Sequence, residues 1–283
     1  MTLTGSGSAH DPRTDPTPRH PAAPAPDRPG AYGPARGLDR RVALVTGASS
    51  GIGAATARRF ALDGWHLLLS GRDRHGLERT ASGTSAVVLP ADLAAPDGPR
   101  LLARSALHTT GRIDALVAGA GLGWTGPFAA MPHTDIDRVL TLDLNATLHL
   151  VREVLPSMIT AGRGRVVLLG AAASSAGVPQ EAVHSAARAG LAAFAEALRR
   201  ELRGTGVGVT LVEPGPVGTA FPAREGEHAG RLSPGHVAAR IWEAVSQDHD
   251  EAGAPARPSL PDRVRELAPG LYRRLTNRSD RPG

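Results

Sequence analysis

The chain has 283 residues, a length that suits one α/β domain with an additional tail, and it contains no cysteine, which excludes disulfide bonds and thiol catalysis. Its formal charge of +5 comes from arginines spread along the chain, and with only 3% aromatic residues it lacks the basic, aromatic-rich face that nucleic-acid binding needs. Because no apolar run approaches a membrane span and no Cys/His cluster has metal-ligand spacing, we expect a cytoplasmic protein with no nucleic-acid partner, no membrane partner and no metal.

The first segment, residues 1–38, is rich in Pro, Ala, Gly, Arg and Asp and shows no apolar periodicity. Such a composition cannot bury a core, so we predict a disordered extension. The segment also lacks the apolar stretch of a secretory signal.

Short apolar runs alternate with helical patterns over residues 39–250, which we predict to be one domain. The predicted strands cover 42–46, 65–69, 86–89, 114–118, 165–170 and 207–212, and the predicted helices cover 52–62, 74–82, 98–110, 135–160, 182–203 and 234–247. This alternation predicts an α/β fold: a single Rossmann-type, doubly wound parallel sheet with helices on both faces. Prolines beyond residue 251 argue against another central strand, so we expect six strands and an arginine-rich C-terminal extension over 251–283.

The most informative motif follows the first predicted strand, where Gly47, Gly51 and Gly53 fall in a T-G-x-x-x-G-x-G pattern. Glycines permit a tight turn and let a pyrophosphate approach the backbone, while the helix that starts there offers free N–H groups and a partial positive charge. In this strand–turn–helix context the pattern predicts a dinucleotide site. The cofactor-binding residues that we assign to the turn are Thr46, Gly47, Ser49, Gly51, Ile52 and Gly53.

The end of the second strand bears on the choice of cofactor. A preference for NAD usually comes from an acidic residue at this strand tip, which bonds the ribose hydroxyls. Here the tip is Ser70, followed by Gly71 and Arg72, and an arginine can fork onto a 2′-phosphate. We therefore expect Arg72 to favour NADP(H) over NAD(H); the alternative is that Arg72 is a solvated loop charge.

Further motifs, in the same order along the chain, resemble those of the short-chain dehydrogenase/reductase (SDR) family. They are the glycine turn, Asp92 after the third strand, the D-A-L-V-A-G-A-G stretch from Asp114, L-N-A-T around Asn145, and Pro214-Gly215 with Thr219. The resemblance reaches to about residue 245 and implies an oxidoreductase that acts on a carbonyl or hydroxyl group of a small-molecule substrate. It also implies cofactor contacts from Asp92, Gly119, Pro214, Gly215 and Thr219, and a structural and catalytic role for Asn145.

The serine, tyrosine and lysine that catalyse the reaction in this family are all replaced. Overlaying residues 164–171 on the family's fifth strand puts Ala171 at the serine position, and the family's spacing then puts His184 at the tyrosine and Arg188 at the lysine. Histidine can act as a general acid or base near neutral pH, whereas arginine can bond ribose hydroxyls but cannot lose its proton. The resemblance thus implies an atypical centre of Asn145, His184 and Arg188, in which Arg188 also holds the cofactor. Ser174 and Ser175 are candidates to replace the lost serine, and a histidine that lines a cleft without chemistry is the alternative for His184.

Small residues recur at helical spacing along the helix predicted at 182–203. They are Ala186, Ala189, Gly190, Ala193 and Ala197. Because this helix joins the dimer interface in the family, the resemblance implies a homodimer or homotetramer; packing within the monomer is the alternative.

Three classes of function remain open from the sequence. The first is an NADP(H)-dependent reductase that uses His184 as proton donor and Asn145 through a water. The second is a non-redox enzyme that runs a dehydration, cyclisation or isomerisation on the same scaffold. The third is a catalytically silent partner that forms a hetero-oligomer with an active relative.

Overall fold

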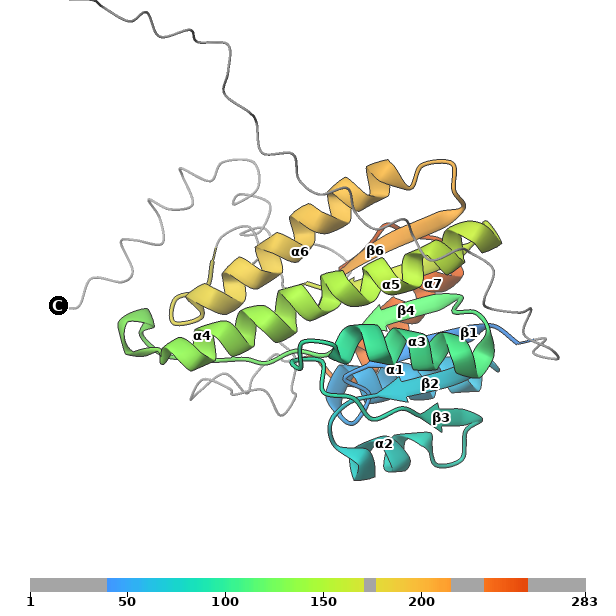
Figure 1. The fold of residues 1–283 in the computed structure, drawn as a ribbon, viewed down its shortest axis with the longest axis horizontal. Coiled ribbons are helices and arrows are strands. Elements are labelled where there is room, and N and C mark those ends of the chain that lie inside the picture. Colours follow the sequence, from blue (N-terminus) through green and yellow to red (C-terminus); the bar gives the residue numbers. More distant parts are fainter. Residues whose placement is uncertain (1–39, 171–176, 215–231, 254–283) are drawn as a thin grey trace, which may run out of the picture. The chain divides into compact units, whose positions relative to one another are not determined.

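The computed structural model describes residues 40–170, 177–214 and 232–253 of the chain. The strands are β1 (Val42–Thr46), β2 (His66–Ser70), β3 (Ala86–Val88), β4 (Ala115–Ala118), β5 (Gly164–Leu169), β6 (Val207–Glu213) and β7 (Glu251–Gly253). The α-helices are α1 (Gly51–Leu62), α2 (Arg74–Ala81), α3 (Gly98–Thr110), α4 (His133–Leu140), α5 (Ala146–Ala161), α6 (Ala182–Glu201) and α7 (Pro234–Ser246). The predicted alternation of strands and helices is confirmed (Figure 1).

All seven strands pair in parallel, in the order β3-β2-β1-β4-β5-β6-β7. The strand order reverses direction between β1 and β4, and in open α/β sheets ligands bind beyond the carboxyl ends of the strands at such a switch point. The β1 strand is buried at all five positions, because helices cover both faces of the sheet. The fold therefore points to the carboxyl ends of β1 and β4 as the place for a site.

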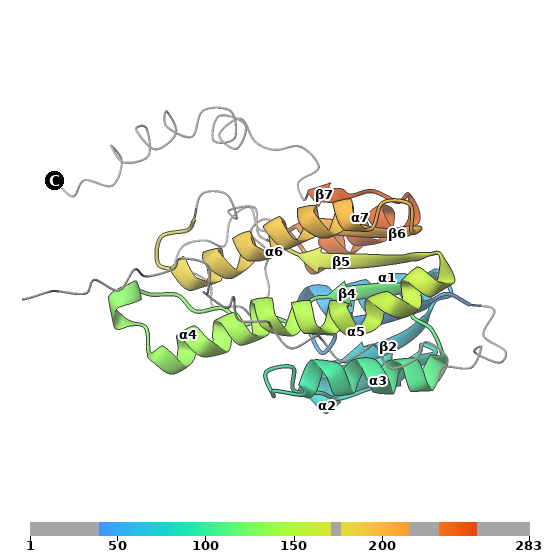
Figure 2. The same ribbon diagram turned by 45° about the horizontal axis from the view of Figure 1, so that its top comes forward.

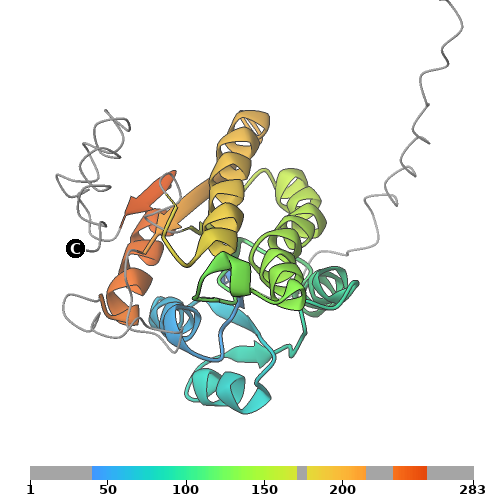
Figure 3. The same ribbon diagram turned by 90° about the vertical axis from the view of Figure 1, so that its left-hand side faces the viewer.

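Two apolar layers flank the sheet. One contains Leu102 of α3, Leu150 of α5 and Ala195 of α6, and the other contains Phe60 of α1 and Ile241 of α7. Figure 3 shows α3, α5 and α6 on one side of the sheet and α1 and α7 on the other. The doubly wound architecture expected from the sequence is confirmed. In the described part of the chain, no helix is both long and apolar enough to cross a membrane.

Two departures from the sequence-based prediction concern individual elements. The sheet formed by the described residues has seven strands and not six, because Glu251–Gly253 adds a three-residue edge strand beside β6. An edge strand pairs on one side alone, so the prolines that follow do not prevent it. The single helix predicted over 135–160 is interrupted by a π-helical turn at Thr141–Asn145 between α4 and α5. Figure 2 shows α4 leading into α5.

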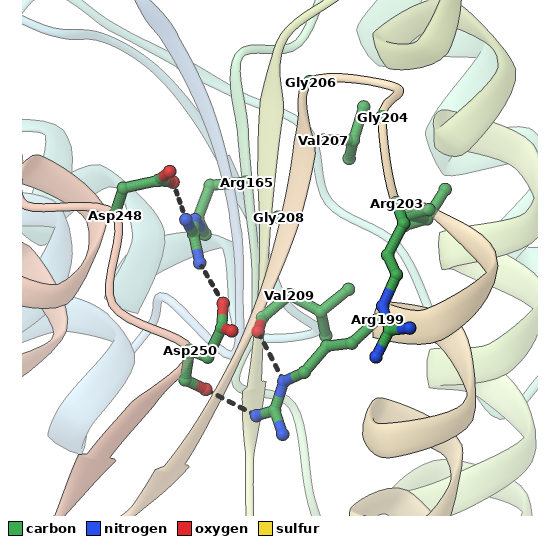
Figure 4. A pocket seen from close by; sticks show the side chains of 11 residues that line it. Arg165, Arg199, Arg203, Gly204, Gly206, Val207, Gly208, Val209, Asp248 and Asp250 are labelled. Atoms are coloured by element: carbon green, nitrogen blue, oxygen red, sulfur yellow. Dashed lines mark hydrogen bonds and ion pairs between the residues drawn. The ribbon is translucent and has the colours of Figure 1, made fainter.

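The short β7 strand is anchored by a buried arginine on β5. Figure 4 shows Arg165 between the carboxylates of Asp248 and Asp250, which precede β7. Its Nη1 also donates to Thr210 Oγ1 and to the His249 carbonyl, each at 3.1 Å. Burial lowers the pKa of Arg165, and Asp250 opposes this shift, so the ion pair offsets part of the cost of the buried charge.

A glycine on the neighbouring strand makes room for this arginine. A Cβ added at Gly208 would lie 2.3 Å from Cζ of Arg165, closer than any real contact. We expect Gly208→Ala to displace the guanidinium and to lower the free energy of unfolding by about 1–3 kcal/mol, measured by urea titration. Gly235→Ala on α7 is the control, since its Cβ would meet only Ser233 Oγ at 3.8 Å. Equal stability of the two variants would show that Arg165 moves without cost.

Candidate functional site

The turn between β1 and α1 is built on close approaches between backbone segments. Gly47 has a φ of +67° and Gly51 a φ of +55°, values that side-chain-bearing residues rarely adopt. A Cβ at Gly53 would lie 2.3 Å from the Gly47 carbonyl oxygen, and one at Gly47 would lie 2.5 Å from that of Gly119. The spacing of glycines thus folds the turn tightly against the loop after β4. Ser50, the N-cap of α1, makes no side-chain capping bond, which leaves the helix N-terminus open to an anionic group.

The buried hydroxyl of Thr46 ties the ends of two strands together. Its Oγ1 accepts hydrogen bonds from the backbone N–H groups of Gly119 at 3.1 Å and Ala120 at 3.2 Å. The hydroxyl itself donates to the carbonyl oxygen of Val117, at an Oγ1–O distance of 3.5 Å. Thr46 therefore holds the carboxyl ends of β1 and β4 in register at the switch point, a role that the sequence motif alone did not specify.

The residues around the tip of β2 and Asp92 lie at the same edge of the sheet. Ser70, at the end of β2, is fully buried, and its hydroxyl has no hydrogen-bond partner in the described part of the chain. Arg72 is exposed beyond it. Asp92 is also exposed and accepts a hydrogen bond from Ala94 N at 3.0 Å through Oδ1. Ser49 lies beside the strand tip, because a Cβ on Gly71 would meet its Oγ at 3.4 Å.

Beside the two predicted site residues of α6 lies a carboxylate that the sequence did not indicate. Asp143 lies in the π-helical turn with its side chain completely covered, and its Oδ2 is 2.8 Å from Nδ1 of His184 on α6. The same oxygen is 3.8 Å from Nη2 of Arg188, one helical turn further along α6. Oδ1 accepts a hydrogen bond of 2.6 Å from Leu122 N, in the loop after β4. The predicted pair on α6 is therefore brought together around a buried acid.

Arg188 is the most deeply buried cation of this cluster. Its Nη1 donates to the carbonyl oxygen of Leu169, the last residue of β5. Burial lowers the pKa of Arg188, and the charge of Asp143 opposes that shift. Its Nε is buried and has no hydrogen-bond partner in the described part of the chain, so one donor of the guanidinium is left over at the carboxyl edge of the sheet.

Other predicted site residues are placed differently. Asn145, at the end of the π-helical turn, is exposed and takes no part in the contacts that join Asp143, His184 and Arg188. Pro214 is half-buried directly after β6. The remaining positions lie outside the described residues; they are Ala171, Ser174, Ser175, Gly215 and Thr219.

An apolar cluster supports the start of α6. Val183, the neighbour of His184, packs with Val139 of α4 and with Met131, and Trp124 in the loop after β4 lies against this group. Gly190 lets α6 approach the π-helical turn closely, because a Cβ at this position would lie 3.2 Å from the side chain of Leu144. Gly190 is thus used for packing within the chain, whereas Ala186, Ala193 and Ala197 are exposed.

Two hollows lie at the opposite edge of the sheet. One, of about 270 Å³, is lined by Arg165 and Gly206 near the starts of β5 and β6. The other, of about 480 Å³, is lined by Arg41 and Trp65 just before β1 and β2. Both lie at the amino ends of the strands, away from the glycine turn and from His184. We place the site at the carboxyl ends, because the glycine turn and the Asp143 cluster meet the same loop there.

The Thr46 hydroxyl offers a direct test of this arrangement. Thr46→Val keeps the shape of the side chain but leaves the N–H groups of Gly119 and Ala120 without their acceptor. We expect a loss of about 1–3 kcal/mol in the free energy of unfolding, measured by urea titration. Thr46→Ser keeps the hydroxyl and is the matched control. A valine variant as stable as the serine variant would contradict the role given to the hydroxyl.

Comparison with known proteins shows which family the chain belongs to. The family model described as short chain dehydrogenase matches residues 41–229. A relative described as dehydrogenase/reductase SDR family protein 7-like, from Anopheles gambiae, is 30% identical over 84% of this chain and 82% of its own length. A metagenomic short-chain oxidoreductase solved with NADP is 31% identical, with a TM-score of 0.67 over 78% of this chain and 98% of that one. A short-chain dehydrogenase/reductase from Burkholderia phymatum solved with NAD is 25% identical, with a TM-score of 0.75 over 82% of this chain and 95% of that one.

Proposed function

Since the chain belongs to the short-chain dehydrogenase family, we propose that it is an NADP(H)-binding oxidoreductase that acts on a carbonyl or hydroxyl group of a small molecule through the atypical centre Asn145, His184 and Arg188. The proposal rests on one observation: the glycine turn and the pair formed by Asp143 and His184 are both hydrogen-bonded to the loop after β4. Gly119 and Ala120 are bonded to Thr46 of the glycine turn, and Leu122 is bonded to the acid that contacts His184. A cofactor cradle and a proton-exchanging side chain therefore share the carboxyl edge of the sheet.

The residues present fit a dinucleotide. The turn after β1 is too tight for a Cβ at Gly47 or Gly53, and the N-terminus of α1 is open to a pyrophosphate. Ser70 Oγ and Arg188 Nε are buried polar atoms without a described protein partner, which suits them to contact a bound molecule. In this proposal Asp92, Pro214, Gly215 and Thr219 complete the cofactor site.

When bound, the nicotinamide cofactor supplies or accepts a hydride. The residues of this chain handle the proton and the charge. His184 gives a proton to the substrate oxygen in reduction or takes one in oxidation, and Asn145 assists through a water. Arg188 cannot lose its proton, so it binds ribose hydroxyls or phosphate and does not act as an acid or base.

A non-redox enzyme on the same scaffold is the second candidate, and one observation favours it. The pair formed by Asp143 and His184 can move a proton without any hydride, as a dehydration, cyclisation or isomerisation requires. Consumption of NADPH by the protein with a carbonyl substrate distinguishes the two candidates.

The exposed small residues of α6 support a proposal about partners. Ala186, Ala193 and Ala197 line an open stretch of this helix. Such a stretch suits close packing against the same helix of a second copy, in a homodimer or homotetramer, or of an active relative in a hetero-oligomer. In the hetero-oligomer case this chain would be a silent partner.

The cofactor preference rests on one exposed arginine. In calorimetry we expect NADPH to bind more tightly than NADH, and Arg72→Gln to weaken NADPH about 10- to 100-fold, the range expected from losing charge-assisted hydrogen bonds to a phosphate. NADH binding should not change. Arg74→Gln is the matched control. Arg74 is an exposed arginine on α2 whose Nη1 lies 3.7 Å from Oε1 of Glu78. Equal affinity of the unaltered protein for both cofactors would remove Arg72 from this role.

The proton donor is tested separately from the cofactor. His184→Ala should lower kcat roughly 10²- to 10⁴-fold with little change in NADPH affinity, the scale expected for losing a general acid. His149→Ala, an exposed histidine on α5, is the control and should leave both quantities unchanged. Full activity of His184→Ala would favour the alternative that His184 lines a cleft without taking part in the chemistry.

A further inference from the structure

We propose that Asp143 is the positioning residue of this site: it holds the Nδ1–H tautomer of His184 and thereby makes Nε2 the nitrogen that exchanges a proton with the substrate. The proposal rests on the proposed function in one respect, namely that His184 is the proton-exchanging group. The test below separates the two.

The argument starts from the surroundings of Asp143. Its side chain is 0% exposed and lies 2.8 Å from Nδ1 of His184, whose own side chain is 15% exposed. A carboxylate in such a place is stable only when hydrogen bonds and a nearby cation replace its hydration. Leu122 N donates to one oxygen, and the guanidinium of Arg188 lies 3.8 Å from the other. The carboxylate is therefore supported as an anion, and an anionic carboxylate only accepts hydrogen bonds.

The state of the histidine ring follows from this. If Asp143 accepts at Oδ2, the proton of that contact belongs to Nδ1 of His184. A neutral ring with its proton on Nδ1 has its lone pair on Nε2, and the charged ring carries a second proton there. The pair thus matches the carboxylate–imidazole arrangement in which a buried acid sets the tautomer of a catalytic base.

The local fold explains why Asp143 reaches α6. If α4 and α5 formed one regular α-helix, its side chains would keep the spacing of about 3.6 residues per turn through residues 141–145. The π-helical turn at Thr141–Asn145 inserts a residue at this point, and such turns often occur at functional sites. Gly190 lets Leu144 of this turn pack closely against α6, and Val183 fixes the start of α6 on Val139 of α4.

The proton step balances with this geometry. In reduction, the N–H bond at Nε2 of the charged ring breaks and an O–H bond forms on the substrate oxygen, while the carbonyl carbon gains the hydride that the reduced cofactor supplies. The ring is left neutral with Nδ1–H still directed at Asp143. Oxidation runs the same bonds in reverse, with Nε2 as the acceptor of the hydroxyl proton.

Asp143→Asn separates the structural role of this residue from its positioning role. The amide oxygen of asparagine can still accept from Leu122 N. Its NH₂ group then faces Nδ1 of His184 and can only donate, which moves the ring proton to Nε2. We expect kcat to fall roughly 10²- to 10⁴-fold with little change in NADPH affinity. Asp137→Asn, an exposed acid on α4, is the matched control and should leave activity unchanged.

The decisive readout is nitrogen-15 NMR of the histidine rings, with His184 assigned by its absence in His184→Ala. We expect the Nδ1–H tautomer in the unaltered protein near pH 8 and the Nε2–H tautomer in Asp143→Asn. An Nε2–H ring in the unaltered protein would overturn the proposal without any need for the variant to fold. An unchanged tautomer in a folded Asp143→Asn would overturn it as well. Failure of the protein to bind NADPH would sink the proposed function and leave the tautomer result standing.

Discussion

One buried carboxylate connects the three segments that form the proposed reaction centre. Asp143 belongs to the π-helical turn, receives the N–H of Leu122 from the loop after β4 and contacts two side chains of α6. Burying this charge alone would cost several kcal/mol, because the carboxylate would lose its hydration. The guanidinium of Arg188 and the ring of His184 offset that cost. The positions of the three side chains therefore depend on one another. Replacing any one of them removes a contact or a charge that the others have in the present structure.

This dependence offers one chemical explanation for both residues that the resemblance implies to be replaced on α6, His184 and Arg188. A tyrosine, which the resemblance implies at the position of His184, would need a neighbouring cation to lower its pKa. Histidine exchanges protons near neutral pH without that help and needs a fixed tautomer instead. Arg188 here directs one nitrogen to the Leu169 carbonyl and another toward Asp143. The cation at this place on the helix therefore balances the charge of a buried acid.

Much of the fold was predictable from the sequence, and the parts that were not have physical causes. Strands buried on both faces leave continuous apolar runs, so β1 and its neighbours were located from the sequence, and the glycine spacing identified the turn after β1. The β7 strand was missed because three residues before a proline carry no periodicity. Asp143 was missed because it stands between Leu142 and Leu144 in a helical pattern, where an acid usually faces solvent. The π-helical turn that directs it inward leaves no mark that a period of 3.6 residues can reveal. A histidine in place of a tyrosine was itself a signal to search for a buried acid nearby.

The same cluster also bears on whether the reaction is redox. An acid–imidazole pair moves protons whether or not a hydride is transferred, so the pair by itself is equally suited to an oxidoreductase and to a lyase or isomerase. The glycine turn by itself is equally suited to a catalytic and to a structural nucleotide. What favours the oxidoreductase is that both are bound to one loop: the N–H groups of Gly119 and Ala120 bond to Thr46, and that of Leu122 bonds to Asp143. A loop fixed at both ends in this way holds the glycine turn at a constant separation from Asp143, which contacts His184. Hydride transfer demands such a separation, because donor carbon, acceptor carbon and proton donor must be in place together. A proton-transfer reaction with a merely structural nucleotide has no such requirement.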